Sequence, residues 1–144
     1  MTRRPSFLVI EDSEPDVFLL RLSLDSEFTE YELIQAMDGD AAIEEIRRLE
    51  AGAEVPDLIV IDLNLPRLSG LDLLSMIRNS PTLRFAPAVV LTSSENPKDK
   101  QRAADLGVLA FIKKPSSLDE FMTVGAILKR HMENYVLENQ SSSD

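Results

Sequence analysis

The stretch LIVIDLNLPRLSG, residues 58–70, begins with four aliphatic residues and then presents an acid, Asp62. An aliphatic run of this length without polar alternation is typical of a strand buried on both faces. Strands of that kind belong to parallel sheets that carry helices on each side. The sequence therefore predicts a buried parallel strand at Leu58–Ile61, with Asp62 directly at its carboxyl end.

Similar short aliphatic runs alternate with helix-like segments along the rest of the chain. The other expected strands are Phe7–Ile10, Tyr31–Ala36, Ala88–Leu91 and Ala110–Lys113. Helices are expected at Pro15–Leu24, Asp40–Leu49, Leu71–Arg78, Pro97–Leu106 and from Leu118 onward. Five strand–helix units in succession predict a doubly wound α/β domain with a five-stranded parallel sheet. The flavodoxin-like strand order 2-1-3-4-5 would make the first and third strands neighbours.

Length, cysteine content and charge restrict the class of protein. The chain has 144 residues, the size of one domain, which we expect over residues 1–138 with a disordered tail at 139–144. Cysteine is absent, which excludes thiol catalysis, disulfides and cysteine metal sites. The formal net charge of −10 disfavours binding to nucleic acid or to an anionic membrane. The first residues hold too short an apolar run for a signal peptide or a membrane span, so a soluble cytoplasmic protein is expected.

Acids follow the first and third expected strands. Glu11 and Asp12 come directly after the first strand, and Asp62 follows the third. In a doubly wound sheet, ligands bind outside the carboxyl ends of the strands at the point where strand order reverses. Three carboxyl groups gathered there need a cation or a retained proton, and oxygen ligands alone favour Mg²⁺. The alternative is that these residues are separate loop acids or helix caps.

The ends of the fourth and fifth strands add a hydroxyl and a cation. Thr92 ends the fourth strand and Lys114 follows the fifth. Together with a divalent metal, these groups would form a phosphoryl site in which the carboxylate of Asp62 is the nucleophile. The alternatives are that Thr92 merely ends its strand and that Lys113 and Lys114 are both solvated.

Four motifs in order along nearly the whole chain resemble the receiver domain of response regulators. They are EDS at 11–13, DLNLPRLSG at 62–70, LTSS at 91–94 and FIKKP at 111–115. The resemblance implies that Glu11 and Asp12 are the acid pair of the metal site and that Asp62 is the phosphoacceptor. It implies that the backbone carbonyl of Asn64 binds Mg²⁺ and that Thr92 and Lys114 bind the phosphoryl oxygens. Phe111 would be an aromatic switch residue. The resemblance also implies a cis peptide bond between Lys114 and Pro115. The alternative for Phe111 is that it is an ordinary residue of the hydrophobic core.

The resemblance also implies partners. In receivers the first helix contacts the helical hairpin of a histidine kinase, and here that helix carries more apolar residues than one buried stripe needs. The residues left on its flanks or outside are Phe18, Leu19 and Leu22, unless they pack against neighbouring helices or chain ends. More narrowly, VIEDSEPDVFLLR at 9–21 and KKPSSLDEF at 113–121 resemble stand-alone regulators paired with bacterial and cyanobacterial phytochromes. Such a regulator lacks an attached output domain, so a protein partner, a downstream phosphotransfer protein or self-association would carry its output.

The last helix suggests self-association. Ser117 and Glu120 form a capping-box pattern, so this helix is expected to begin near Leu118 and to continue to about Leu137. Apolar spacing persists beyond the part needed to cover the sheet and predicts a homodimer contact at Met132, Tyr135 and Val136. The alternative is that these residues fold back on their own domain or dock a different protein.

Two other classes of function stay open. A haloacid-dehalogenase-type hydrolase also uses a strand-end aspartate and Mg²⁺, but it requires a second aspartate two residues on, where this chain has Asn64. A scaffold without phosphotransfer would lack part of the set of acids, threonine and lysine, which is complete here. The sequence therefore favours a phosphoacceptor switch over a hydrolytic enzyme.

Overall fold

The computed structural model describes residues 4–142, with side chains to residue 139. The strands are β1 (Ser6–Ile10), β2 (Glu32–Ala36), β3 (Leu58–Ile61), β4 (Ala88–Thr92) and β5 (Ala110–Lys113). The helices are α1 (Glu14–Asp25), α2 (Gly39–Glu50), α3 (Gly70–Asn79), α4 (Pro97–Asp105), α5 (Leu118–Phe121) and α6 (Val124–Ser142). None of the helices in this described part has the length and apolar character needed to cross a lipid bilayer.

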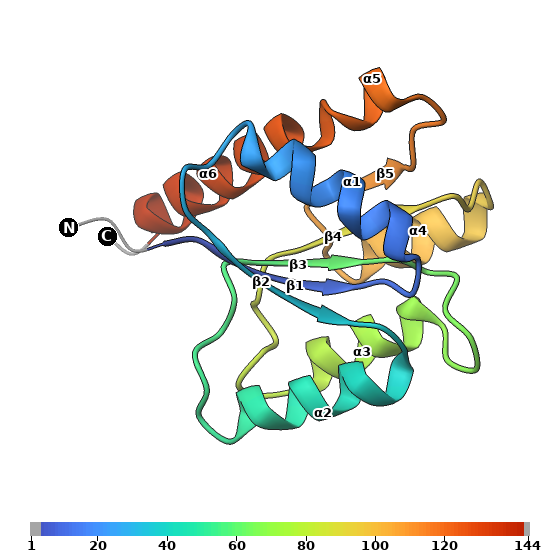
Figure 1. Ribbon diagram of the computed structural model, residues 1–144. Helices are drawn as coiled ribbons and strands as arrows, with labels where there is room; N and C mark the ends of the chain where they lie inside the picture. The colour runs from blue at the N-terminus through green and yellow to red at the C-terminus, as the bar shows by residue number, and fades with distance from the viewer. Residues whose placement is uncertain (1–3, 143–144) are drawn as a thin grey trace.

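The five strands form one parallel sheet in the order β2-β1-β3-β4-β5, so the predicted fold is confirmed (Figure 1). The register places Ile10, the last residue of β1, opposite Ile61, the last residue of β3. Both strands therefore end at the same level, and the residues that follow them emerge side by side. β3 and β4 are buried along their whole length, whereas β5 at the edge is only partly covered.

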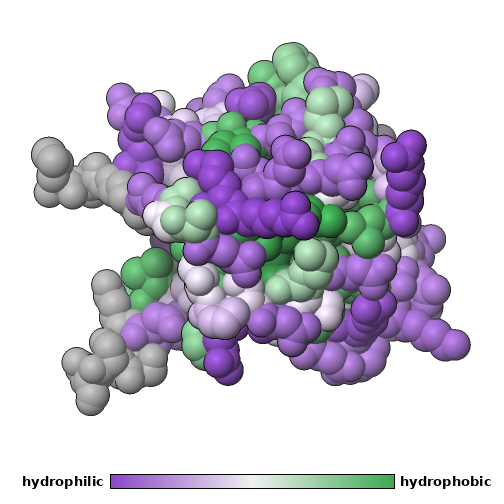
Figure 2. All heavy atoms as spheres, turned by 90° about the horizontal axis from the view of Figure 1, so that it is seen from below, coloured by the Kyte–Doolittle hydropathy of each residue, from purple (hydrophilic) through white to green (hydrophobic). Residues whose placement is uncertain are grey.

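Helices cover both faces of the sheet (Figure 1). One core lies beneath α1, α5 and α6 and includes Phe7, Leu20 and Leu128. The other lies beneath α2 and α3 and includes Ile46 and Leu74. Figure 2 views the α2 and α3 side, where hydrophilic side chains surround a smaller area of hydrophobic ones. Both faces of the sheet are thus used for packing, which leaves its carboxyl edge to present polar groups.

The expected continuous last helix is interrupted. Its N-cap is correct, because the Ser117 hydroxyl accepts a hydrogen bond from the Glu120 N–H, but α5 ends at Phe121 and α6 begins at Val124. The buried hydroxyl of Ser23 on α1 donates to the Met122 carbonyl at 2.8 Å and accepts from the Gly125 N–H at 2.6 Å. A polar side chain inserted into the backbone ladder in this way is a recognised cause of a helix break.

The end of the chain also differs from the expectation. A disordered tail was expected at residues 139–144, but α6 continues through Ser142, so residues 139–142 are helical. Residues 143–144 lie outside the described part. The polar composition of the tail does not prevent a helix that is already nucleated from being extended, since each added residue gains a backbone hydrogen bond.

Candidate functional site

Asp62 follows β3 directly and is held by backbone contacts. Its N–H donates to the Ile10 carbonyl at 3.0 Å, and its Oδ1 accepts from the Asn64 N–H at 3.2 Å. Its side chain is 5% exposed. Gly70 begins α3 against this residue, and a Cβ at Gly70 would lie 2.2 Å from the Asp62 carbonyl oxygen. The absence of a side chain at position 70 therefore allows α3 to start next to Asp62.

The structure brings Asp62 together with both acids that follow β1. One carboxylate oxygen from each of Glu11, Asp12 and Asp62 lies within 4.8 Å of the others. Glu11 and Asp62 are buried and Asp12 is exposed. A donor set made only of oxygen atoms, partly open to solvent, fits a hard divalent cation that keeps several water ligands.

Lys114 reaches this cluster from the loop after β5. Its ammonium lies 2.5 Å from Glu11 Oε1, 2.7 Å from Asp16 Oδ2 and 3.1 Å from Asp62 Oδ2. Lys113 instead points outward and pairs with the exposed Glu95. Of these two lysines, Lys114 is therefore the one that lies at the acid cluster.

Asp16 was missed by the sequence analysis, which considered only acids at strand ends. It lies in the first turn of α1, four residues after Asp12. Its N–H donates to the Ser13 hydroxyl, which caps the helix. Its position in the sequence could have identified Asp16 as a site residue. A helix that starts directly after β1 carries its first turn over the carboxyl edge of the sheet (Figure 1).

The pKa values of the ionisable groups in this cluster are shifted in different directions. Burial, together with the neighbouring Asp62 carboxylate, raises the pKa of Glu11 to about 7 even though Lys114 opposes the shift. Burial also opposes ionisation of Asp62, but hydrogen bonds from Glu11 and the Asn64 N–H and the charge of Lys114 outweigh it and lower its pKa. For Lys114, burial disfavours the charge, yet contacts with Asp16 and Glu11 raise the pKa. Asp62 is therefore the carboxyl group that ionises more readily, and Glu11 is the one that retains a proton in part of the molecules at neutral pH.

Thr92 ends β4 next to Asp62 and is completely buried. Its hydroxyl oxygen accepts hydrogen bonds from the Asn64 side-chain amide at 3.4 Å and the Ser94 N–H at 3.3 Å. The Lys114 N–H donates to the Thr92 carbonyl at 2.8 Å, which fixes the loop after β5 against the end of β4. A carboxylate, a hydroxyl and an ammonium from three strand ends therefore converge at one point.

Comparison with known proteins agrees with this geometry. The family model described as "Response regulator receiver domain" matches residues 7–125. The chain belongs to the response regulator receiver family. The response regulator Rcp1 of Synechocystis sp. is 34% identical to this receiver over 133 residues, which cover 90% of each chain. Other curated relatives are longer, and the receiver spans 23% of one of them and 59% of another.

Two solved structures extend the similarity. The phosphorylated cyanobacterial phytochrome response regulator RcpA superimposes with a TM-score of 0.79 at 32% identity, over 87% of this chain and 91% of RcpA. The Mn²⁺-bound form of Rcp1 gives a TM-score of 0.76 at 32% identity, over 84% of this chain and 88% of Rcp1. The receiver is thus similar to phytochrome response regulators in both sequence and structure.

Two expectations at β5 have different outcomes. Phe111 is half-buried and packs in a small cluster with Val90 and Ala103, which places it between β4 and α4. The expected cis bond between Lys114 and Pro115 is wrong, because no peptide bond among the described residues is cis. The trans isomer is intrinsically favoured by about 0.5–1 kcal/mol even before proline, and with it Lys114 already reaches three carboxylates.

The residues expected to dock a kinase are exposed to different degrees. Phe18 is 62% exposed and Leu22 is 37% exposed on the outer face of α1. Leu19 is half-buried and packs against the core beneath α1 and α6, as the alternative reading anticipated. Phe18 and Leu22 thus form the exposed apolar part of this helix.

The residues expected at a homodimer contact also differ in how far they are exposed. Met132 is partly buried against the core of its own domain. The Tyr135 hydroxyl donates to the Phe85 carbonyl at 2.8 Å, so this side chain also folds back. Val136 is 51% exposed and, with Leu137, continues the apolar stripe into solvent.

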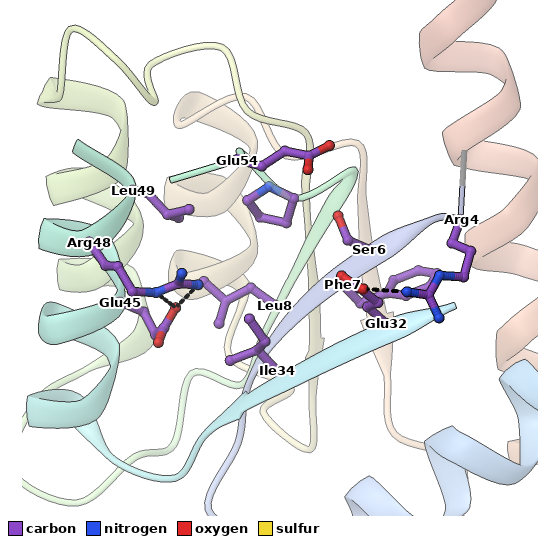
Figure 3. Close-up of a pocket in the computed structure, with 11 residues that line it drawn as sticks. Arg4, Ser6, Phe7, Leu8, Glu32, Ile34, Glu45, Arg48, Leu49 and Glu54 are labelled. Atoms are coloured by element: carbon purple, nitrogen blue, oxygen red, sulfur yellow. Dashed lines mark hydrogen bonds and ion pairs between the residues drawn. The ribbon is translucent and has the colours of Figure 1, made fainter. Parts of the chain in front are cut away.

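A hollow of about 320 Å³ lies at the opposite end of the sheet from Asp62, between β2 and α2 (Figure 3). Among its lining residues, Arg4 pairs with Glu32 at 2.9 Å and Arg48 pairs with Glu45 of the same helix at 3.0 Å. Both arginines are thus neutralised by glutamates. Among the described residues, the hollow therefore has no arginine left without a glutamate partner, which disfavours the binding of a phosphate group there.

Proposed function

We propose that this receiver accepts a phosphoryl group on Asp62 from the phosphohistidine of a partner histidine kinase, in a two-component or phosphorelay system. The observation that carries this proposal is the contact at 3.1 Å between the ionised Asp62 carboxylate and the Lys114 ammonium, beside Glu11 and Asp12. This arrangement combines a nucleophile with a cation that can neutralise phosphoryl oxygens. In this proposal the protein is a cytoplasmic switch that takes part in its own phosphotransfer and dephosphorylation, not an enzyme for a separate substrate.

The transfer step is an in-line displacement. A carboxylate oxygen of Asp62 attacks phosphorus, an O–P bond forms, the N–P bond breaks, and its electron pair stays on the imidazole nitrogen of the donor. Lys114 and the Thr92 hydroxyl donate hydrogen bonds to the phosphoryl oxygens. Glu11, Asp12, Asp62 and the backbone carbonyl of Asn64 would hold Mg²⁺, which supplies positive charge to offset the oxygens of the phosphoryl group.

The assignment is tested with a small phosphodonor such as acetyl phosphate in the presence of Mg²⁺. Acyl-phosphate formation is expected in the wild-type protein and in Asp72→Asn, which removes an exposed acid from the first turn of α3. It should disappear in Asp62→Asn and on chelation of the metal. Undiminished labelling of Asp62→Asn would place the phosphoacceptor elsewhere.

A phytochrome-linked histidine kinase is the partner that we propose. The similarity to Rcp1 and RcpA supports this choice, and the exposed Phe18 and Leu22 offer a docking surface on α1, the helix whose first turn contacts Lys114 through Asp16. Phe18→Ala should slow phosphotransfer from the cognate kinase while leaving labelling by acetyl phosphate unchanged. Phe85→Ala is the matched control, because Phe85 is 74% exposed in the loop before β4, at the other end of the sheet from Asp62. Equal transfer rates from phytochrome-linked and unrelated purified kinases would contradict the pairing.

The output of the switch would be a change of surface. An aspartyl phosphate adds charge and oxygen acceptors that Thr92 and Lys114 can bind, and Phe111 on β5 pairs with Val90, two residues before Thr92 on β4. Nearly complete switching requires about 5.5 kcal/mol of differential stabilisation between the two states. A downstream phosphotransfer protein that docks on α1 is one recipient of this output. Transfer of label from phosphorylated receiver to such a protein, lost in Phe18→Ala, would support it.

A homodimer through α6 is a further part of the proposal. A groove of about 810 Å³ runs beside the helix and is lined by Met132, Tyr135 and Val136 together with Phe28 and Pro87. The exposed Val136 can enter the groove of a second copy, and a twofold axis would repeat the contact. Sedimentation velocity at tens of micromolar should show a dimer for the wild type and for Met76→Glu on α3, and a monomer for Val136→Glu. A monomeric wild type, phosphorylated or not, would exclude the dimer.

A further inference from the structure

Lys114 has three carboxylate partners, but only two of them belong to the acid cluster. Its contacts to Glu11 and Asp62 are made with carboxylate groups of the cluster formed by Glu11, Asp12 and Asp62. The third partner is Asp16 on α1, at 2.7 Å, closer than Asp62. A lysine ammonium has three N–H donors; here it donates hydrogen bonds to Asp16 and Asp62 and forms an ion pair with Glu11.

A divalent cation at the acid cluster competes with the ammonium for the carboxylate groups of Glu11 and Asp62. This competition affects two of the three contacts of Lys114, because Glu11 and Asp62 both belong to the cluster and are its buried members. Asp16 lies outside the group of oxygen atoms that converge within 4.8 Å, so its contact with Lys114 is not in competition. The side chain of Lys114 is only 12% exposed, which means that an ammonium released from all its partners would lack solvation as well as counter-charge.

We propose that Asp16 is a positioning residue that holds the Lys114 ammonium at the site when a metal ion takes the oxygens of Glu11 and Asp62. One N–H of Lys114 stays on Asp16, and the other two become available for phosphoryl oxygens. This inference rests on the proposed phosphoacceptor function of Asp62. It assigns Asp16 a role that acts through Lys114 and does not involve contact with the phosphoryl group.

The placement of Asp16 is well suited to this role. Its backbone N–H is fixed by the Ser13 hydroxyl that caps α1, at 3.3 Å, so the side chain starts from a rigid turn. The same cap follows Glu11 and Asp12 directly in the chain, and the Ser13 N–H donates to Glu11 Oε2 at 3.2 Å. The acid pair and the anchor of Lys114 are therefore held by one helix N-terminus.

Glu14 provides a matched control. It shares the first turn of α1 with Asp16 and therefore has a similar interaction with the helix dipole, but it is exposed and does not contact Lys114. Asp16→Asn and Glu14→Gln each remove one negative charge near the site without changing the size of the side chain. A difference between these two variants thus reports the contact with Lys114 and not the loss of charge.

The direct readout is NMR of the lysine ammonium groups in ¹⁵N-labelled protein, since a hydrogen-bonded and shielded ammonium exchanges its protons slowly enough to be observed. The Lys114 signal is assigned by its absence in Lys114→Met. Before Mg²⁺ is added, we expect the signal in the wild type and in both variants. After Mg²⁺ is added to saturation, it should persist in the wild type and Glu14→Gln and disappear in Asp16→Asn.

The kinetic readout is phosphorylation by acetyl phosphate at saturating Mg²⁺. Asp16→Asn should slow it at least fivefold, while Glu14→Gln should stay within twofold of the wild type. An unchanged ammonium signal and rate in Asp16→Asn, or equal effects of both variants, would overturn the role of Asp16. A wild type that takes no phosphate would instead contradict the proposed function, and the NMR comparison would still test whether Asp16 holds Lys114.

Discussion

The affinity of this receiver for Mg²⁺ should depend on the ionisation of Glu11. Burial beside Asp62 raises the pKa of Glu11 to about 7, so its carboxyl retains a proton in part of the molecules at neutral pH. A metal ion needs the carboxylate, and binding must therefore displace this proton. Since the proton is lost as pH rises through the pKa, the apparent affinity should rise with pH and not fall.

The size of the effect follows from the pKa. Glu11 is ionised in about one tenth of the molecules at pH 6, one half at pH 7 and nine tenths at pH 8. The lowered pKa of Asp62 keeps that carboxylate ionised over the whole range. The apparent Mg²⁺ affinity should thus be about tenfold higher at pH 8 than at pH 6, which corresponds to about 1.4 kcal/mol.

Isothermal titration calorimetry in buffers of different ionisation enthalpy measures both the affinity and the protons released. We expect about half a proton released per metal ion at pH 7. Glu11→Gln should bind Mg²⁺ more weakly and with little pH dependence, whereas Glu14→Gln should keep the tenfold change. An affinity that is constant between pH 6 and 8, with no proton release, would refute the account of Glu11 as the protonated member of the cluster.

Three further predictions concern packing. Gly70→Ala places a Cβ 2.2 Å from the Asp62 carbonyl oxygen, so it should destabilise the protein by about 1–3 kcal/mol in urea unfolding and slow phosphorylation; normal values of both would contradict the close approach. Leu128→Ala should cost about 2–5 kcal/mol because Leu128 is fully buried, while the exposed Leu137→Ala should stay within about 0.5 kcal/mol, and similar costs for the two would be inconsistent with the packing of α6. Ser23→Ala leaves two buried backbone groups without their partner and should cost about 1–3 kcal/mol, with loss of amide protection at the start of α6 by hydrogen exchange; retained protection would rule out the bridge.

The sheet and the acids at its edge could be predicted because one-dimensional patterns report them. An aliphatic run such as Leu58–Ile61 indicates burial on both faces, and parallel strands end at the same edge of a sheet. The residue after each strand is thus placed by topology alone. That is why Glu11, Asp62 and Lys114 could be grouped before their distances were known.

Features that depend on the approach of distant backbones could not be predicted in this way. The break between α5 and α6 requires Ser23 to lie against Gly125, about a hundred residues later, and helical periodicity continues across the break without a signal. Met132 and Tyr135 have the spacing of an exposed stripe, but Tyr135 finds a hydrogen-bond acceptor in the loop at Phe85. Periodicity shows which side of a helix is apolar and not which surface covers it.

The charges at the site explain why metal and lysine should act together. Glu11, Asp12, Asp16 and Asp62, when all are ionised, place four negative charges near the single positive charge of Lys114, a formal excess of −3. Phosphorylation of Asp62 replaces one negative charge with roughly two. Without a divalent cation the excess would rise further, and like charges this close strongly oppose one another. A divalent cation at Glu11 and Asp12 offsets two of these negative charges, and Asp16 then prevents Lys114 from being driven away by the same cation. The acyl phosphate should therefore form fastest when both positive groups are in place, so the loss of Asp16 should slow phosphorylation, whereas the loss of Asp62 should abolish it.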